Sequence, residues 1–173
     1  MEKSYLNTKK SIKRESGSGF TMVELIITLA ILSFGIIGVY NAFYSMIILS
    51  NNISSRFTAT YLSQEGLEIV RNIRDNNFIL SAAWSNGLLG CNLGCQGDYK
   101  TNASLQAYNN NFLKLNTDGF YSYDSGVATK FKRKITITQP SGTDTLKAIV
   151  QVLWDDNGKP SSFETEEYLY NWH

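Results

Sequence analysis

Residues 19–49 read GFTMVELIITLAILSFGIIGVYNAFYSMIIL, and this stretch decides the fold of the amino-terminal third. No Asp, Glu, Lys or Arg lies between Glu24 and Arg56, and no proline interrupts residues 25–49. At a rise of 1.5 Å per residue, a helix over residues 25–49 is about 37 Å long, which exceeds the ~30 Å hydrocarbon core of a bilayer. The run therefore predicts one membrane-spanning helix over residues 25–49.

Two other kinds of segment also contain long apolar runs. A cleaved secretory signal has a shorter apolar core followed by a small-x-small cleavage site, and residues 50–55 (SNNISS) lack an Ala-x-Ala site. A buried core helix is shorter and carries charge near its ends. A signal anchor fits better, since basic residues before the span keep that end in the cytoplasm and place the rest of the chain outside.

Charge and rare residue types exclude several classes of function. The formal net charge is +1, but residues 1–19 hold five basic and two acidic residues, so the remainder is slightly acidic. A near-neutral body offers no broad basic surface for nucleic acid. The single histidine is His173, which leaves no residue for a Ser/His/Asp triad or a His-based zinc site. We therefore expect no enzyme, no metal and no cofactor.

Glu24 is the one charged residue at the start of the apolar run, and its neighbours form a motif. A short basic leader ends in Gly19, and then come Phe20, three residues, Glu24 and the apolar run. GFTMVELIITLAIL, residues 19–32, resembles the signal of type IV prepilins and pseudopilins at every position. The resemblance is strict over residues 14–35 and loose beyond them.

The resemblance implies how the chain is processed and assembled. A prepilin peptidase would cut between Gly19 and Phe20 at the cytoplasmic face and N-methylate the new amino terminus of Phe20, which makes residues 1–19 a cleaved leader. Glu24 would pair with the amino terminus of a neighbouring subunit. The expected partners are the peptidase, other pilin or pseudopilin subunits, an assembly platform protein and membrane lipid.

The same resemblance implies a function and a location. The chain would be a structural subunit, a minor pilin of a type IV pilus, first held as a single-pass protein of the cytoplasmic membrane with its head outside and then moved to the pilus or cell surface. One alternative is a pseudopilin of a type II secretion system. The other is a plain signal-anchored surface binding domain.

Small residues recur within the span. Gly35, Gly38 and Ala42 can form a surface for close helix packing. Glycine is also common in membrane helices without such a role.

Beyond the span, the apolar pattern becomes that of an amphipathic helix. One face of a helix collects residues at steps of three and four, namely Ala59, Leu62, Gly66, Ile69, Val70 and Ile73. Asn76 and Asn77 are expected to break this pattern. The sequence thus predicts one long helix over residues 20–76, with a head over residues 77–173.

The head is predicted to be rich in antiparallel strands. Residues 112–115 and 120–123 flank a Gly-containing turn and predict a hairpin. Alternating residues predict further strands over residues 131–138, 146–154 and 162–170. Their expected buried side chains are Phe131, Ile135, Ile137, Leu146, Ala148, Val150, Val152 and Trp154. A long helix followed by an antiparallel meander is an α+β fold, and it is also the pilin arrangement.

Cys91 and Cys95 have three interpretations: a disulfide, half of a metal site, or free thiols. The sequence offers no further cysteine or internal histidine as a metal ligand. Both residues lie outside the cytoplasm in the predicted orientation, where oxidation occurs, so a disulfide is favoured.

Two other patterns in the head have a structural and a binding explanation. The tyrosines, together with Lys130, Lys132, Arg133 and Lys134, suggest nucleic-acid binding, but ordinary strand composition is favoured. Residues 155–158 (DDNG) suggest calcium, but they lack the spacing of an EF-hand loop, and a turn is favoured.

Overall fold

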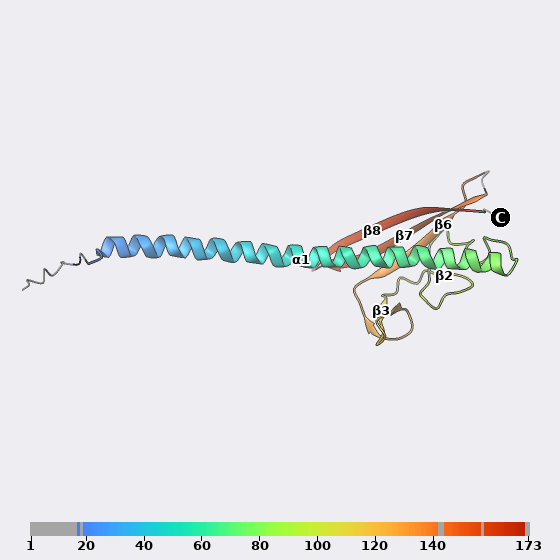
Figure 1. Ribbon diagram of the computed structural model, residues 1–173, viewed down its shortest axis with the longest axis horizontal. Helices are drawn as coiled ribbons and strands as arrows, with labels where there is room; N and C mark the ends of the chain where they lie inside the picture. The colour runs from blue at the N-terminus through green and yellow to red at the C-terminus, as the bar shows by residue number, and fades with distance from the viewer. Residues whose placement is uncertain (1–16, 18, 142–143, 157, 172–173) are drawn as a thin grey trace, which may run out of the picture. The chain divides into compact units, whose positions relative to one another are not determined.

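The computed structural model describes residues 17, 19–141, 144–156 and 158–171. Helix α1 covers Met22–Ile79 and precedes eight strands in the described residues (Figure 1). The strands are β1 Cys95–Gln96, β2 Gln106–Ala107, β3 Lys114–Leu115, β4 Tyr121–Ser122, β5 Val127–Ala128, β6 Lys132–Thr138, β7 Thr145–Asp156 and β8 Lys159–Tyr170. This order confirms the predicted α+β, pilin-like arrangement. The contacts divide the chain into two units, with the boundary between Ile47 and Ile48.

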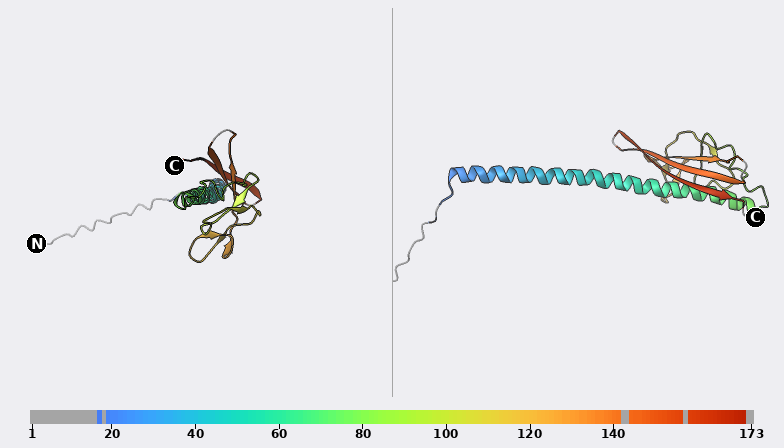
Figure 2. Two further views of the ribbon diagram at one scale, coloured as in Figure 1. Left: turned by 90° about the vertical axis from the view of Figure 1, so that its right-hand side faces the viewer. Right: turned by 90° about the horizontal axis from the view of Figure 1, so that it is seen from above.

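The main sheet contains the three predicted long strands. Its order is β2-β1-β6-β7-β8, and β6, β7 and β8 form an antiparallel meander. Residues of β7 from Leu146 to Trp154 alternate between buried and partly buried, as the sequence pattern predicts. Figure 2 shows these strands beside the carboxy-terminal part of α1, which belongs to the same unit.

The core of the head lies between this sheet and one face of α1. The helix contributes Ala59, Leu62, Ile69, Val70 and Ile73, which confirms the predicted amphipathic face. Gly66 lies on that face, and a Cβ added there would be 2.7 Å from Cγ1 of Val150. Because real Cβ atoms do not approach so closely, glycine is what allows the helix and β7 to pack at this point.

The end of α1 differs from the prediction. Asn76 and Asn77 do not break the helix, which continues to Ile79. Asn77 is buried because its side-chain amide donates to the carbonyl oxygens of Trp84 and Asn86, at 3.1 and 2.8 Å. The helix ends in a Schellman arrangement, in which Ala82 N bonds to Asn77 O, Ser81 N bonds to Phe78 O, and Ser81 has a φ of 53°.

The predicted hairpin of residues 112–123 forms, but in a separate sheet. Lys114 pairs with Ser122 and Leu115 with Tyr121, as expected for a hairpin. The turn is held by Asn116, whose side-chain oxygen accepts from Asp118 N and Phe120 N. Strand β5 completes this three-stranded sheet, β4-β3-β5, so the hairpin does not extend the main meander.

Some predicted features fall on residues that are not described. Of the predicted leader, only Gly17 and Gly19 lie within the described residues. In the predicted turn after β7, Asn157 also lies outside them. Gly158 N bonds to Oδ1 of Asp155 at 2.6 Å.

Candidate functional site

The predicted processing site lies immediately before α1. Thr21 caps the helix: its hydroxyl oxygen accepts from Glu24 N at 3.2 Å, and its carbonyl oxygen accepts from Leu25 N at 3.1 Å. Phe20 precedes the cap and is 77% exposed. A Cβ added at Gly19 would meet no atom within 4 Å. The peptide bond between Gly19 and Phe20 is therefore outside the helix and open to another protein.

Glu24 lies in the first turn of α1 and is exposed. A carboxylate at this position interacts favourably with the positive end of the helix dipole. Among the described residues, Glu24 has no ion-pair partner. Within the described part of the chain, its charge is therefore not compensated by an ion pair.

The apolar residues that follow Glu24 are all exposed. A window of α1 is apolar and long enough to cross a membrane, and none of that window is buried. Gly35 and Gly38 have no atom within 4 Å of an added Cβ, so no contact within the described chain requires either glycine. This part of α1 presents an apolar surface whose side chains are exposed among the described residues.

Helix α1 has a first part, residues 22–54, in which no residue is buried, and a second part, residues 55–79, which contains all its buried residues. Arg133, which is adjacent in sequence to Lys132 and Lys134, connects the second part to the head. Arg133 is fully buried. Its Nη1 lies 3.0 Å from Leu62 O and 3.0 Å from Oε2 of Glu65, and its Nη2 lies 2.7 Å from Gly97 O. A buried charge is tolerated only with such partners. The burial of Arg133 could have been predicted from the sequence, because Arg133 lies at the same alternating positions as Phe131, Ile135 and Ile137.

A second polar contact joins α1 to the loop end of β7. Asp156 accepts hydrogen bonds from Lys130, from the hydroxyl of Ser55 at 3.3 Å and from Nε1 of Trp154 at 2.8 Å. Burial raises the pKa of Asp156, but these hydrogen bonds outweigh it, so the net pKa is below the ordinary value. The Asp156 carboxylate thus connects α1, through Ser55, to the end of β7.

A disulfide joins Cys91 and Cys95, with a Cα–Cα distance of 5.2 Å. Gly94, inside the loop, has a φ of 115°, which explains a glycine at that position. Both cysteines are buried in the same core cluster as Leu88 and Ile135. The disulfide therefore joins two residues of the head's hydrophobic core.

Lys130, Lys132 and Lys134, the lysines near Arg133, contact aromatic rings or a carboxylate of the same chain. Nζ of Lys132 lies 4.4 Å from the centre of the Phe112 ring, and Nζ of Lys134 lies 5.9 Å from that of Tyr108. Lys130 pairs with Asp156. With Arg133 buried between them, these residues do not form a continuous basic strip.

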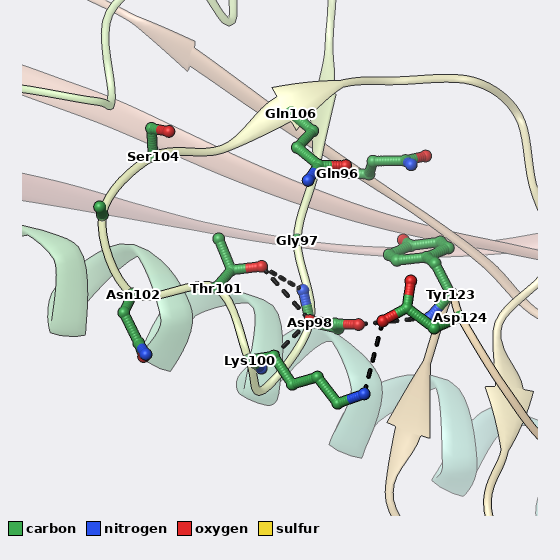
Figure 3. Close-up of a pocket in the computed structure, with 11 residues that line it drawn as sticks. Gln96, Gly97, Asp98, Lys100, Thr101, Asn102, Ser104, Gln106, Tyr123 and Asp124 are labelled. Carbon is green, nitrogen blue, oxygen red and sulfur yellow. Dashed lines mark hydrogen bonds and ion pairs between the residues drawn. The ribbon is translucent and has the colours of Figure 1, made fainter.

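The loops beside β1 and β2 enclose a polar pocket of about 270 Å³ (Figure 3). Its rim is organised by Asp98, whose carboxylate accepts from Lys100 N, from the Thr101 hydroxyl and from Tyr123 N. Across the described residues, no group of three or more His, Cys, Asp or Glu side chains is placed to hold a metal ion.

Comparison with known proteins identifies the amino-terminal segment. Residues 16–40 match the family model described as the prokaryotic N-terminal methylation motif. No curated protein and no solved structure matches the chain. The motif points to a structural subunit rather than an enzyme, and together with an apolar helix it indicates membrane anchoring before assembly. Residues 16–40 thus carry the class III signal peptide of type IV pilins and pseudopilins.

Proposed function

We propose that this protein is a structural subunit, a minor pilin, of a type IV pilus. It is made as a membrane-anchored precursor and joins a filament through the first part of α1. The observation that carries the proposal is the coincidence of the methylation motif at residues 16–40 with an uncovered apolar helix surface.

Processing is the first step of the proposed function. A prepilin peptidase would cut between Gly19 and Phe20, where the chain is accessible before the Thr21 cap. The missing Cβ of Gly19 lets the backbone approach the peptidase closely. The cut leaves an ammonium group on Phe20, which the same type of enzyme would methylate.

Assembly then depends on charge pairing at the start of the helix. A lone carboxylate in an apolar filament core costs about 3 kcal/mol, on the scale measured for a charge at the centre of a helix in lipid. A neighbouring subunit's ammonium group at about 4 Å recovers about 4 kcal/mol at an effective dielectric constant near 20. Glu24, which has no ion-pair partner within the described chain, would therefore select for a correctly placed neighbour.

The remaining partners follow from this scheme. The precursor would contact membrane lipid through residues 25–49, and an assembly platform protein would transfer it to the growing filament. A pseudopilin of a type II secretion system has the same signal peptide and is the second candidate.

Fractionation of cells that express the tagged full-length protein tests the proposal. We expect the protein in filaments sheared from the cell surface, and we expect it to be lost from that fraction when the prepilin peptidase or the pilus assembly ATPase is deleted. Dependence on the type II secretion ATPase instead would assign the chain to a pseudopilus. Retention in the membrane in every strain would contradict both assignments and favour a surface-anchored domain.

A further inference from the structure

The polar pocket of the head is built by two segments that are distant in sequence. The stretch from Gln96 in β1 to Gln106 in β2 contributes most of the lining, and the end of the hairpin contributes Tyr123 and Asp124 (Figure 3). Figure 3 places the side chains of Gln96 and Gln106 at one side of the pocket and those of Lys100 and Asp124 at the other. Neither the processing signal nor α1 accounts for this pocket.

Several polar side chains in the pocket have hydrogen-bonding groups without a partner among the described residues. Gln96 is 3% exposed and accepts from Asn109 N through Oε1, while its amide nitrogen has no hydrogen bond among the described residues. Within the same described part of the chain, the side chains of Asn102, Ser104 and Gln106 make none either. The pocket thus offers amide and hydroxyl groups that both donate and accept.

The charges of the pocket are, in contrast, already neutralised or satisfied. The carboxylate of Asp98 accepts three hydrogen bonds from the rim. Lys100 pairs with Asp124 at 3.4 Å. Among the described residues that line the pocket, the one cation, Lys100, already pairs with a carboxylate, which favours a neutral ligand over an anionic one. The described residues also provide no metal cluster.

An exposed aromatic pair adjoins the pocket. The rings of Tyr99 and Phe120 are stacked, with centroids 5.0 Å apart, and these residues are 40% and 54% exposed. Asn116 donates to the hydroxyl of Tyr99 at 3.3 Å and fixes the ring. Nζ of Lys100 lies 5.6 Å from the centre of the Tyr99 ring, so the residue that lines the pocket also touches the pair.

We propose that the pocket and the Tyr99–Phe120 pair bind one neutral sugar residue of a glycan. Sugar hydroxyls donate and accept hydrogen bonds and match the free groups of Gln96, Ser104 and Gln106. The C–H face of a pyranose ring packs on exposed aromatic side chains, and Tyr99 and Phe120 are both partly exposed next to the pocket. The volume of about 270 Å³ is slightly below the usual range for drug-sized ligands and suits a single ring. This inference does not depend on whether the filament is a pilus or a pseudopilus.

Saturation-transfer NMR with the full-length protein tests the proposal. The protein is held in phosphocholine micelles, because detergents with sugar headgroups would compete. The probes are the methyl glycosides of glucose, galactose, mannose and N-acetylglucosamine. We expect transfer to at least one glycoside, and a loss of affinity of about fivefold or more in Gln106→Ala, since one net hydrogen bond contributes about 1 kcal/mol. Tyr99→Ala should weaken binding at least as much.

Tyr168→Ala is the matched control. Tyr168 is 45% exposed and lies 5.6 Å from a lysine ammonium group, that of Lys147, as Tyr99 does from Lys100. It lies in β8, outside the pocket. This variant should bind the glycoside like the wild type, and all three variants should melt within a few degrees of it.

Three results would overturn the proposal. The first is the absence of transfer to every glycoside. The second is equal binding by wild type, Gln106→Ala and Tyr99→Ala. The third is binding of a thymidine oligonucleotide that the same two substitutions abolish while glycosides do not bind, which would make the site one for single-stranded nucleic acid.

Discussion

The two parts of α1 contain glycines for opposite reasons. In the first part, an added Cβ at Gly35 or Gly38 would meet open space, whereas at Gly66 it would collide with Val150. The buried residues of α1 all lie at or after Ser55. The second part thus completes the core of the head, while the first part leaves its small and apolar residues for a membrane or for other chains.

The acidic residues of α1 differ in the same way. Glu65 pairs with the buried Arg133 at 3.0 Å, so its partner is in the chain. Glu24 has no ion-pair partner among the described residues, and its proposed partner is the amino terminus of a neighbouring subunit. Mutations in the first part should therefore reduce filament incorporation, whereas mutations in the second part should lower the free energy of unfolding of the head.

The largest expected effect on assembly is that of Glu24→Ala. In the proposed filament, removing the carboxylate removes about 4 kcal/mol of pairing with a neighbouring amino terminus and about 3 kcal/mol of burial cost. The net loss is about 1 kcal/mol, so the protein recovered in sheared filaments should fall about fivefold. The amount in the membrane fraction should not change. Immunoblots of the two fractions measure both quantities.

Glu68→Ala is the control for Glu24→Ala. Glu68 lies in the second part of α1 and is exposed, and its one ion-pair partner among the described residues is Arg71 on the same helix. Its loss should leave filament incorporation unchanged. Normal incorporation of Glu24→Ala, or an equal defect in Glu68→Ala, would contradict the division of α1 into two parts.

Arg133→Ala should have the largest effect on stability. It leaves the carbonyl oxygens of Leu62 and Gly97 without their buried donor, and the loss of one partner from a buried charged network costs about 3–5 kcal/mol. Denaturant unfolding of the full chain in micelles, followed by tryptophan fluorescence, measures the change. Arg133→Met should cost less, because its side chain keeps the apolar packing.

Lys132→Ala is the matched control in the next position of β6. Lys132 is partly exposed and faces the other side of the sheet, so its removal should change the free energy of unfolding by about 0.5 kcal/mol or less. Equal effects of the two alanine substitutions would show that Arg133 does not fasten the helix to the head.

The same substitution, to alanine, at Gly66 and at Gly38 compares the two parts of α1 directly. The new methyl group at position 66 would lie 2.7 Å from Val150 and should destabilise the head by about 1–3 kcal/mol. At position 38 the same change meets no atom of the described chain, so the head should unfold as in the wild type while filament incorporation falls. The unfolding and shearing assays give both results. A stable Gly66→Ala head, or a destabilised Gly38→Ala head, would be contrary to this account.

The smallest expected effect is on the pH dependence of stability. The pKa of Asp156 is lower in the folded protein than in the unfolded chain. The ionised carboxylate therefore stabilises the fold above the ordinary pKa of an aspartate, and this stabilisation is lost as the pH falls through the pKa of the folded state. Asp156→Asn should therefore reduce the loss of stability below about pH 4. Unfolding curves at neutral and acid pH measure this, and Asp118→Asn, at an exposed turn position, is the control. An unchanged acid profile in Asp156→Asn would remove Asp156 from the contacts that stabilise the folded head.

The elements with clear periodicity could be predicted from the sequence. Residues at helical spacing between Ala59 and Ile73, and alternating residues in β6 and β7, are buried as expected because their spacing fixes which face meets the core. The motif around Gly19 and Glu24 was also readable, because its residues are adjacent in the chain.

Other features depended on contacts that no local pattern contains. Strands β1, β2 and β5 have two residues each, which is too short for any periodicity. The helix end at Ser81 lacks the usual glycine. From the sequence, Asn77 is expected to end the helix, but its side-chain amide donates to the carbonyl oxygens of Trp84 and Asn86, which allows it to lie buried inside the helix. The pocket is assembled from segments distant in sequence, so only the fold brings Gln106 and Asp124 together.

The mass of the amino-terminal peptide of the protein from native membranes and sheared filaments tests the central claim most directly. The account predicts a peptide that begins at Phe20 and carries one added methyl group, and it predicts the intact precursor in a strain that lacks the prepilin peptidase. A leader still attached to Phe20 in cells with an active peptidase would contradict it, because the signal at residues 16–40 would then not be processed.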